Sequence, residues 1–249
     1  MANMLSSNTE IPDARDDSLA EDRRPLKTRS WSVFQRIAAW LARSGVSPNA
    51  ISVSSILFAV AGAVGFVLTA WFESSWAVRA AWFMAAVGIQ LRLIANLLDG
   101  MVAVEGGRAS ATGPLYNEVP DRISDPILLV AAGYAIASNP TAGWAAASAA
   151  LMVAYVRAIA ASVGVGQLFL GPMAKPQRMA VLTAVAIAGV LLPSDWLVWN
   201  VGDWPVGLVE IALWLITLGC VVTVARRLSV AGSFLRTRHE APPATPENT

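Results

Sequence analysis

Six apolar runs of about twenty residues each restrict what this chain can fold into. A helix of that length crosses the hydrocarbon core of a bilayer. Charged residues make up 14% of the chain, whereas soluble domains carry about 25%. The runs cover residues 50–71, 76–98, 116–137, 141–161, 177–193 and 205–225. We therefore predict an all-α integral membrane protein, built as a bundle of six transmembrane helices.

The stretch before the first run predicts an amphipathic helix lying at the membrane interface. Its apolar residues recur at helical spacing, with arginines among them: Trp31, Phe34, Ile37, Ala38, Leu41, Arg36 and Arg43. An ordinary core helix of a soluble domain is the alternative. We predict a disordered cytoplasmic tail over residues 1–30, which are polar and contain no signal-peptide pattern. The membrane domain then covers residues 31–226, and residues 227–249 form a C-terminal cytoplasmic tail.

The distribution of lysine and arginine predicts the orientation in the membrane. Seven of these residues precede the first run, and others follow the second, fourth and sixth runs, whereas the opposite loops carry only Arg79. The positive-inside rule then places both termini in the cytoplasm. We expect the membrane to be the cell's inner (plasma) membrane. The formal net charge is +1, which gives no electrostatic reason to expect a nucleic-acid partner.

A polar segment, residues 96–125, joins the second and third runs. Asn96 and Asp99 share one helix face, and Asn117, Asp121 and Asp125 share another. Carboxylates at the edge of a membrane segment are costly, so they indicate a functional site. If the two helices pack side by side, these oxygen atoms converge, and oxygen ligands suit Mg²⁺. The other interpretation is that these acids merely cap helix ends.

This segment resembles the signature of the CDP-alcohol phosphatidyltransferase family. The family pattern is D-x2-D-G-x2-A-R, then eight or nine residues, then G-x3-D-x3-D. Its positions fall here on Asn96, Asp99, Gly100, Ala103, Val104, Gly113, Asn117 and Asp121. The GVSPNAISVSS stretch, YVRA at 155–158 and KPQR at 175–178 are also similar to the family. The resemblance covers about residues 31–226.

The resemblance implies a transfer of a phosphatidyl group from CDP-diacylglycerol to an alcohol, with release of CMP, in phospholipid biosynthesis. It implies Mg²⁺ or Mn²⁺ held by Asn96, Asp99, Asn117 and Asp121, with Asp121 as the general base. Implied contacts of the CDP and phosphate groups are Gly100, Ala103, Arg108, Gly113 and Asp125. Arg157, Lys175 and Arg178 are the implied acceptor-binding residues, although anchoring to anionic lipid headgroups would also explain them. The family is usually dimeric, so a homodimer is expected.

The departures from the signature bear on the metal site. Two of its four acids are amides here, and its arginine is Val104. Fewer negative charges favour one ion, or a site completed by substrate phosphates, over two tightly bound ions. Arg108 or Arg122 could replace the missing arginine. Arg92 lies inside the second run, so it either takes the place of one metal's charge or forms an ion pair with Asp121 or Asp125.

Two other functions remain open from the sequence. A non-catalytic member would keep the fold and bind a lipid-nucleotide or a partner protein, which the two amides favour. A small transporter is the third reading, but the sequence shows no pair of broken helices of the kind such proteins use. The acceptor alcohol is not specified by any motif.

Overall fold

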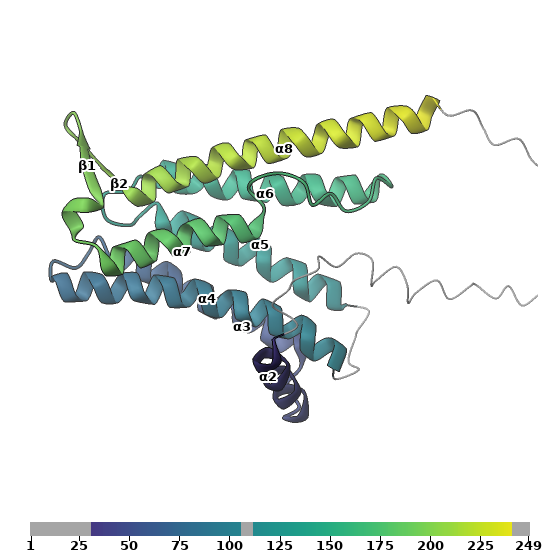
Figure 1. Ribbon diagram of the computed structural model, residues 1–249, viewed down its shortest axis with the longest axis horizontal. Helices are drawn as coiled ribbons and strands as arrows, with labels where there is room; N and C mark the ends of the chain where they lie inside the picture. The colour runs from purple at the N-terminus through teal and green to yellow at the C-terminus, as the bar shows by residue number, and fades with distance from the viewer. Residues whose placement is uncertain (1–30, 106–111, 241–249) are drawn as a thin grey trace, which may run out of the picture.

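The computed structural model describes residues 31–105 and 112–240, and these are almost entirely helical (Figure 1). The all-α class is therefore confirmed. The elements in chain order are α2 (Ser32–Arg43), α3 (Pro48–Leu68), α4 (Ser75–Glu105), α5 (Gly113–Ala132), α6 (Pro140–Ser162), α7 (Lys175–Leu191), a short 3-10 helix (Ser194–Trp196), β1 (Val198–Val201), β2 (Trp204–Gly207) and α8 (Leu208–Glu240).

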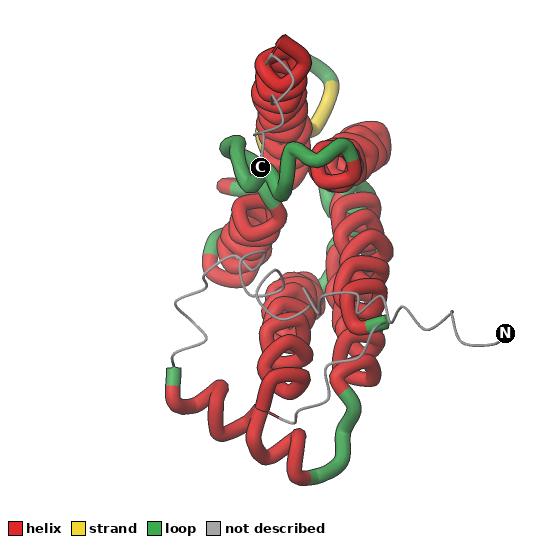
Figure 2. Tube along the Cα trace, turned by 90° about the vertical axis from the view of Figure 1, so that its right-hand side faces the viewer, coloured by secondary structure: helices red, strands yellow, loops and turns green. Residues whose placement is uncertain are grey.

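Helices α3 to α8 form a closed ring. Each packs against two neighbours, in the order α3, α4, α7, α8, α6, α5 and back to α3. Figure 2 shows these helices nearly end-on. Two pairs of consecutive helices, α3 with α4 and α5 with α6, are neighbours in space. Helix α4 touches α5 only slightly, so its main neighbours are α3 and α7.

Local sequence determines where several of these helices begin and end. Ser47 precedes Pro48, and its side chain accepts a hydrogen bond from the backbone N–H of Ala50 at 3.2 Å. Asn139 precedes Pro140 and accepts from the N–H of Thr141 at 2.8 Å. These are the usual N-cap and first-turn residues. Such caps fix the entry of α3 and α6 into the ring.

Glycines bring two helix pairs into close contact. A Cβ atom on Gly88 of α4 would lie only 2.5 Å from the Cα of Gly62 on α3. A Cβ on Gly133 would lie 3.0 Å from the Cα of Gly143 on α6. Small residues at facing positions let membrane helices approach this closely. They hold α3 against α4, and α6 against the C-terminal end of α5.

Within the described residues, four helices are long and apolar enough to cross a membrane. They are 48–68, 75–104, 140–162 and 208–239. Helix α5 begins with residues 113–125 of the polar segment, and α7 has only 17 residues. The described structure thus supports an integral membrane protein with four clear spans. Cys220 lies buried in α8, as expected for a small apolar side chain.

One small element differs from the sequence prediction. Residues 198–207 form an antiparallel hairpin, with Gly202 at φ +64° in its turn. The N–H of Gly207 donates to the carbonyl of Ala137 at 2.6 Å, which attaches the hairpin to the α5–α6 connection. Because β2 includes residues 205–207, α8 starts at Leu208 rather than at 205. It then continues to Glu240, beyond the predicted end of the sixth run.

Candidate active site

A cavity of about 880 Å³ opens at the end of the ring where α4 finishes and α5 and α7 begin. Its lining contains both polar and apolar side chains. The polar residues in its lining are Asn96, Glu118, Asp121, Arg122, Arg157, Lys175 and Arg178. The apolar lining includes Leu93, Ile94, Phe169, Ala184 and Ile187. This is the combination that a ligand with a charged head and an apolar body requires.

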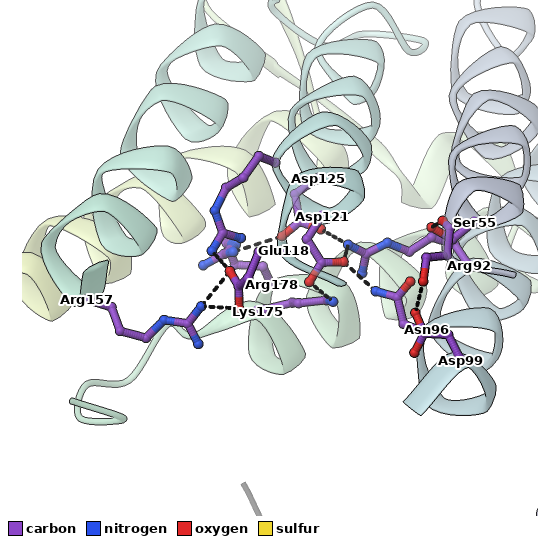
Figure 3. Close-up of polar contacts among 12 residues, drawn as sticks. Ser55, Arg92, Asn96, Asp99, Glu118, Asp121, Asp125, Arg157, Lys175 and Arg178 are labelled. Carbon is purple, nitrogen blue, oxygen red and sulfur yellow. Dashed lines mark hydrogen bonds and ion pairs between the residues drawn. The ribbon is translucent and has the colours of Figure 1, made fainter. Parts of the chain in front are cut away.

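Asp121 lies in this cavity and receives hydrogen bonds from three side chains (Figure 3). Its Oδ1 accepts from Nη2 of Arg92 at 2.9 Å and from Nδ2 of Asn96. Its Oδ2 pairs with Nζ of Lys175. The residue as a whole is 9% exposed. Asp121 is therefore held in one orientation, with a cation on each oxygen.

Asp125 lies one turn further along α5 and is buried behind Asp121. Its Oδ1 accepts from Nη2 of Arg92 at 2.5 Å, and its Oδ2 accepts from Nη2 of Arg178 at 2.9 Å. Arg178 also donates to the carbonyl of Met173 at 3.2 Å. Asp125 does not line the cavity, so its role in this arrangement is to hold two buried cations. The ion pair considered for Arg92 is present, with both acids.

Asp99 turns away from this group. Its Oδ2 accepts a hydrogen bond from the hydroxyl of Ser52 on α3 at 2.6 Å, and the residue is 4% exposed. Asn96 and Asp99 are three positions apart, which places them about 60° apart around the helix. Asn96 therefore reaches α5 while Asp99 faces α3. Among the described residues, Asp99 is in no ion pair, unlike Asp121 and Asp125.

A second group of charges lies beside the first. Glu118 accepts from Nη2 of Arg157 with both oxygens, at 2.7 and 2.8 Å, and also pairs with Arg122. The guanidinium of Arg157 lies over the ring of Phe169, 5.8 Å from its centroid. These side chains are partly exposed. Arg122 and Arg157 form a basic rim of the cavity, and Glu118 partly neutralises its positive charge.

The structure brings together some of the predicted site residues and not others. Asn96, Asp121, Lys175 and Arg178 line one cavity, and Arg157 reaches it from α6. Gly100 and Ala103 lie near the end of α4, and Gly113 is the first residue of α5. Arg108 and the side chain of Asn117 lie outside the described residues. Ser52 and the pairing of Glu118 with Arg157 were not predicted, because helical spacing within one helix does not show which side chains of the neighbouring helix it meets.

The donor set suits one divalent ion better than two. Among the described residues, no group of three or more His, Cys, Asp and Glu side chains is placed to hold a metal. Asp121 and Asp125 already have cations on their oxygens. Asp99 has no such partner among the described residues, and the side-chain oxygen of an asparagine is a further hard ligand. One or two carboxylates with substrate phosphates are a common Mg²⁺ site.

An apolar groove runs out of the cavity between α4 and α7. Its volume is about 310 Å³, and it includes Phe83, Leu91, Val190 and Leu191. Gln90, Thr183 and Ile187 line both spaces. The amide of Gln90 donates to the hydroxyl of Thr183 at 2.8 Å. The apolar groove therefore adjoins the polar cavity at these three residues.

A ring of helices with a charged cavity and an adjoining apolar groove is the arrangement of a membrane-embedded protein that handles amphiphilic ligands. Comparison with known proteins specifies the class further. The chain is 27% identical over 206 residues to the phosphatidylinositol phosphate synthase of Streptomyces avermitilis, covering 79% of this chain and 76% of that protein. It is 26% identical over 182 residues to the archaetidylinositol phosphate synthase of Methanothermobacter thermautotrophicus, covering 73% and 84%. It is 22% identical over 189 residues to the inner membrane protein YnbA of Escherichia coli, covering 76% and 90%.

Solved structures show the same fold. The phosphatidylinositol phosphate synthase of Mycobacterium tuberculosis in complex with manganese and citrate superposes with a TM-score of 0.64 at 20% identity, covering 87% of this chain and 93% of that one. The same enzyme with CDP-diacylglycerol bound gives 0.63 at 21% identity, covering 88% and 100%. No profile of a known protein family matches the chain. The chain is thus a divergent relative of the CDP-alcohol phosphatidyltransferases.

Proposed function

We propose that this protein transfers a phosphatidyl group from CDP-diacylglycerol to an alcohol, with release of CMP. The observation that carries the proposal is Asp121, a fixed carboxylate in a charged cavity that adjoins an apolar groove. The relatives named as phosphatidylinositol phosphate synthases, and the Mycobacterium tuberculosis enzyme with CDP-diacylglycerol bound, support it. The cavity accommodates the nucleotide and pyrophosphate, and the groove accommodates the acyl chains.

Asp121 is the general base in this proposal. The acceptor oxygen bonds to the phosphorus that carries diacylglycerol, and the bond from that phosphorus to the bridging oxygen breaks, so that CMP leaves with the bridging oxygen. Asp121 takes the proton of the acceptor hydroxyl. A carboxylate has about four acceptor positions, so the contacts with Arg92, Asn96 and Lys175 leave room for the hydroxyl.

The basic residues around Asp121 bind and orient the phosphates. Lys175 and Arg122 line the cavity, and so do Arg157 and Arg178. Charged hydrogen bonds of this type are about twice as strong as neutral ones. Arg157, Lys175 and Arg178 are the residues proposed to receive the acceptor, and Gly100, Ala103 and Gly113 those proposed to border the CDP moiety.

Mg²⁺ or Mn²⁺ would be held by Asp99, with amide oxygens of Asn96 and Asn117 and with substrate phosphates. When bound there, a divalent ion would supply charge neutralisation for the leaving group. The manganese in the Mycobacterium tuberculosis structure supports the choice of metal. Asp121 would contact the ion only if Arg92 or Lys175 moved.

In the membrane, we propose that all six ring helices span the bilayer and that α2 lies in the interface. Helices α5 and α7 are too polar or too short to be clear spans alone, but the ring shields them with the four apolar helices. Trp31, which directly precedes α2, and Trp40 of α2 are 61% and 60% exposed, as expected for interfacial anchors. The cavity and both termini then face the cytoplasm, and a homodimer in the inner membrane is proposed.

A non-catalytic binding protein is the second candidate. It is favoured by one observation, namely that both oxygens of Asp121 are engaged by cations. Such a protein would bind CDP-diacylglycerol without transferring its phosphatidyl group. The two candidates differ in whether CMP is released.

The decisive experiment is CMP release by the purified protein in lipid nanodiscs. The mixture contains CDP-diacylglycerol, Mg²⁺ or Mn²⁺ and a pool of candidate alcohols, with Asp121→Asn as the matched variant. Release that requires the metal, an alcohol and Asp121 would establish the transferase. Binding of CDP-diacylglycerol without release would establish the binding protein instead.

A further inference from the structure

The three acids Asp99, Asp121 and Asp125 differ in how many cations they pair with. Asp121 and Asp125 together pair with three cations, Arg92, Lys175 and Arg178. Asp99 is near this group but pairs with none of them in the described structure, and its Oδ2 accepts from a neutral hydroxyl. An added divalent cation would therefore be attracted by Asp99 and repelled by the cations on Asp121.

Arg92 is the centre of this arrangement. It lies on α4 with 0% exposure, and its Nη2 reaches both Asp121 and Asp125 (Figure 3). Its Nε and Nη1 are buried without a hydrogen-bond partner in the described part of the chain. A buried arginine with two unpartnered donor nitrogens is costly, so its presence here indicates that the site uses its charge.

The amide of Asn96 contributes to the same group of contacts around Asp121. Its Nδ2 donates to the same Oδ1 of Asp121 that Arg92 contacts. An aspartate at position 96 has no such donor, and it would place a second negative charge against Asp121. The amide at 96 and the guanidinium at 92 thus act together to satisfy Asp121 without a metal ion.

We infer that Arg92 is a built-in cation that takes the place of a metal ion at Asp121, so that each chain binds one divalent ion, at Asp99. The inference deepens the proposed function, because it takes this cavity to be the metal-dependent site. Two-metal sites place carboxylates where they can clamp both ions. In this protein the guanidinium of Arg92 takes the place of the second metal ion. Unlike a metal ion, it cannot dissociate or be removed by a chelator.

The test counts bound Mn²⁺ directly, by electron paramagnetic resonance on the full chain in nanodiscs without substrate. We expect one ion per chain in the wild type. Asp99→Asn should raise the half-saturating Mn²⁺ concentration by at least about tenfold, because the loss of an outer-shell partner alone has an effect of that size and Asp99 is the ligand itself. Two ions per chain, or one ion that survives Asp99→Asn unchanged, would overturn the inference.

Replacing the built-in cation should create a second site. We expect the double variant Arg92→Gln with Asn96→Asp to bind two Mn²⁺ per chain, whereas Arg79→Gln, at the other end of α4, should still bind one. Arg92→Lys keeps the positive charge and should also bind one, which provides a readout if the double variant fails to fold. A lysine variant that binds two ions would contradict the inference.

The result is independent of whether the protein turns out to be an enzyme. Mn²⁺ is counted without CDP-diacylglycerol, so a chain that binds one ion but releases no CMP would retain the inference and lose the transferase. A chain that releases CMP but binds two ions would lose the inference and retain the transferase.

Discussion

Glu118 holds Arg157 with both carboxylate oxygens, at 2.7 and 2.8 Å from Nη2. The pair joins α5 to α6 at the cavity rim and is partly exposed. Its effect is to neutralise a guanidinium that would otherwise be free to bind an anionic group. Glu118 therefore offers a way to test what kind of acceptor the cavity selects.

Glu118→Gln should favour a phosphate-bearing acceptor. We expect the KM of a phosphorylated polyol to fall by up to about fivefold, which corresponds to the ~1 kcal/mol of a partly exposed ion pair. The KM of the unphosphorylated polyol should stay the same. Steady-state CMP release with each acceptor measures the effect. Glu210→Gln, in the first turn of α8, is the control, and an equal change for both acceptors would contradict the prediction.

Asp121 and Asp125 should respond differently to the same change. Asp121→Asn should lower turnover by at least about 10²-fold, because a general base contributes that much. Asp125→Asn should weaken turnover less and lower stability more, by about 3–5 kcal/mol, because Arg92 and Arg178 lose a buried partner. CMP release and thermal unfolding in detergent measure the two effects. If Asp125 were the essential residue for turnover, the register of the signature on this chain would be wrong.

The contact between Gly62 and Gly88 should tolerate no added methyl group. Gly88→Ala would force α3 and α4 apart, and overpacking of this kind costs about 1–3 kcal/mol. Gly232→Ala is the matched control, because the nearest atom to its new Cβ is the end of Arg236 at 3.7 Å. It should be neutral or stabilising by up to about 1 kcal/mol. A melting temperature that falls equally in both variants would refute the packing argument.

Filling the apolar side of the cavity should exclude the lipid. Ala184 lines the cavity near Ile187, where the groove begins. Ala184→Trp should lower the affinity for CDP-diacylglycerol with long acyl chains more than for a short-chain analogue. Equilibrium binding in nanodiscs compares the two. Leu218→Trp, on the exposed face of α8, adds the same bulk elsewhere and should leave both affinities unchanged.

Cys220 should report unfolding. It is the one cysteine in the chain and is 0% exposed. A maleimide should therefore label the folded protein very slowly, and the labelling should rise together with thermal unfolding. Destabilised variants such as Gly88→Ala should be labelled at lower temperature than the wild type. Rapid labelling of the intact protein at low temperature would mean that the α8 packing around Cys220 opens readily.

Much of the fold could be predicted from hydrophobic run lengths, because each ring helix follows one run. The hairpin at 198–207 could not, since its strands are only four residues long and lie where a run was expected to start. The closed ring of helices could not be predicted from the sequence either. It depends on contacts between α4 and α7 and between α6 and α8, and no motif specifies them.

The candidate active site was likewise predictable only in part. Helical spacing indicated that Asn117, Asp121 and Asp125 share a face, and the structure places Asp121 and Asp125 together. Spacing did not show that Asp99 turns to Ser52 while Asn96 turns to Asp121, because that depends on which neighbours flank α4. The contacts of Arg92 were foreseen only as an alternative. An arginine in an apolar run needs a partner, but which partner depends on the ring.

Helix α8 has 33 residues, which at 1.5 Å per residue is about 50 Å, whereas a hydrocarbon core is about 30 Å thick. Its C-terminal part extends beyond the other ring helices in Figure 1. A small protein buried in a detergent micelle offers little to align in electron microscopy. A rigid protein fused to this extension as a continuous helix would lie outside the micelle, where it could be used to align particle images. It would be fixed to α8, the same helix that borders the cavity.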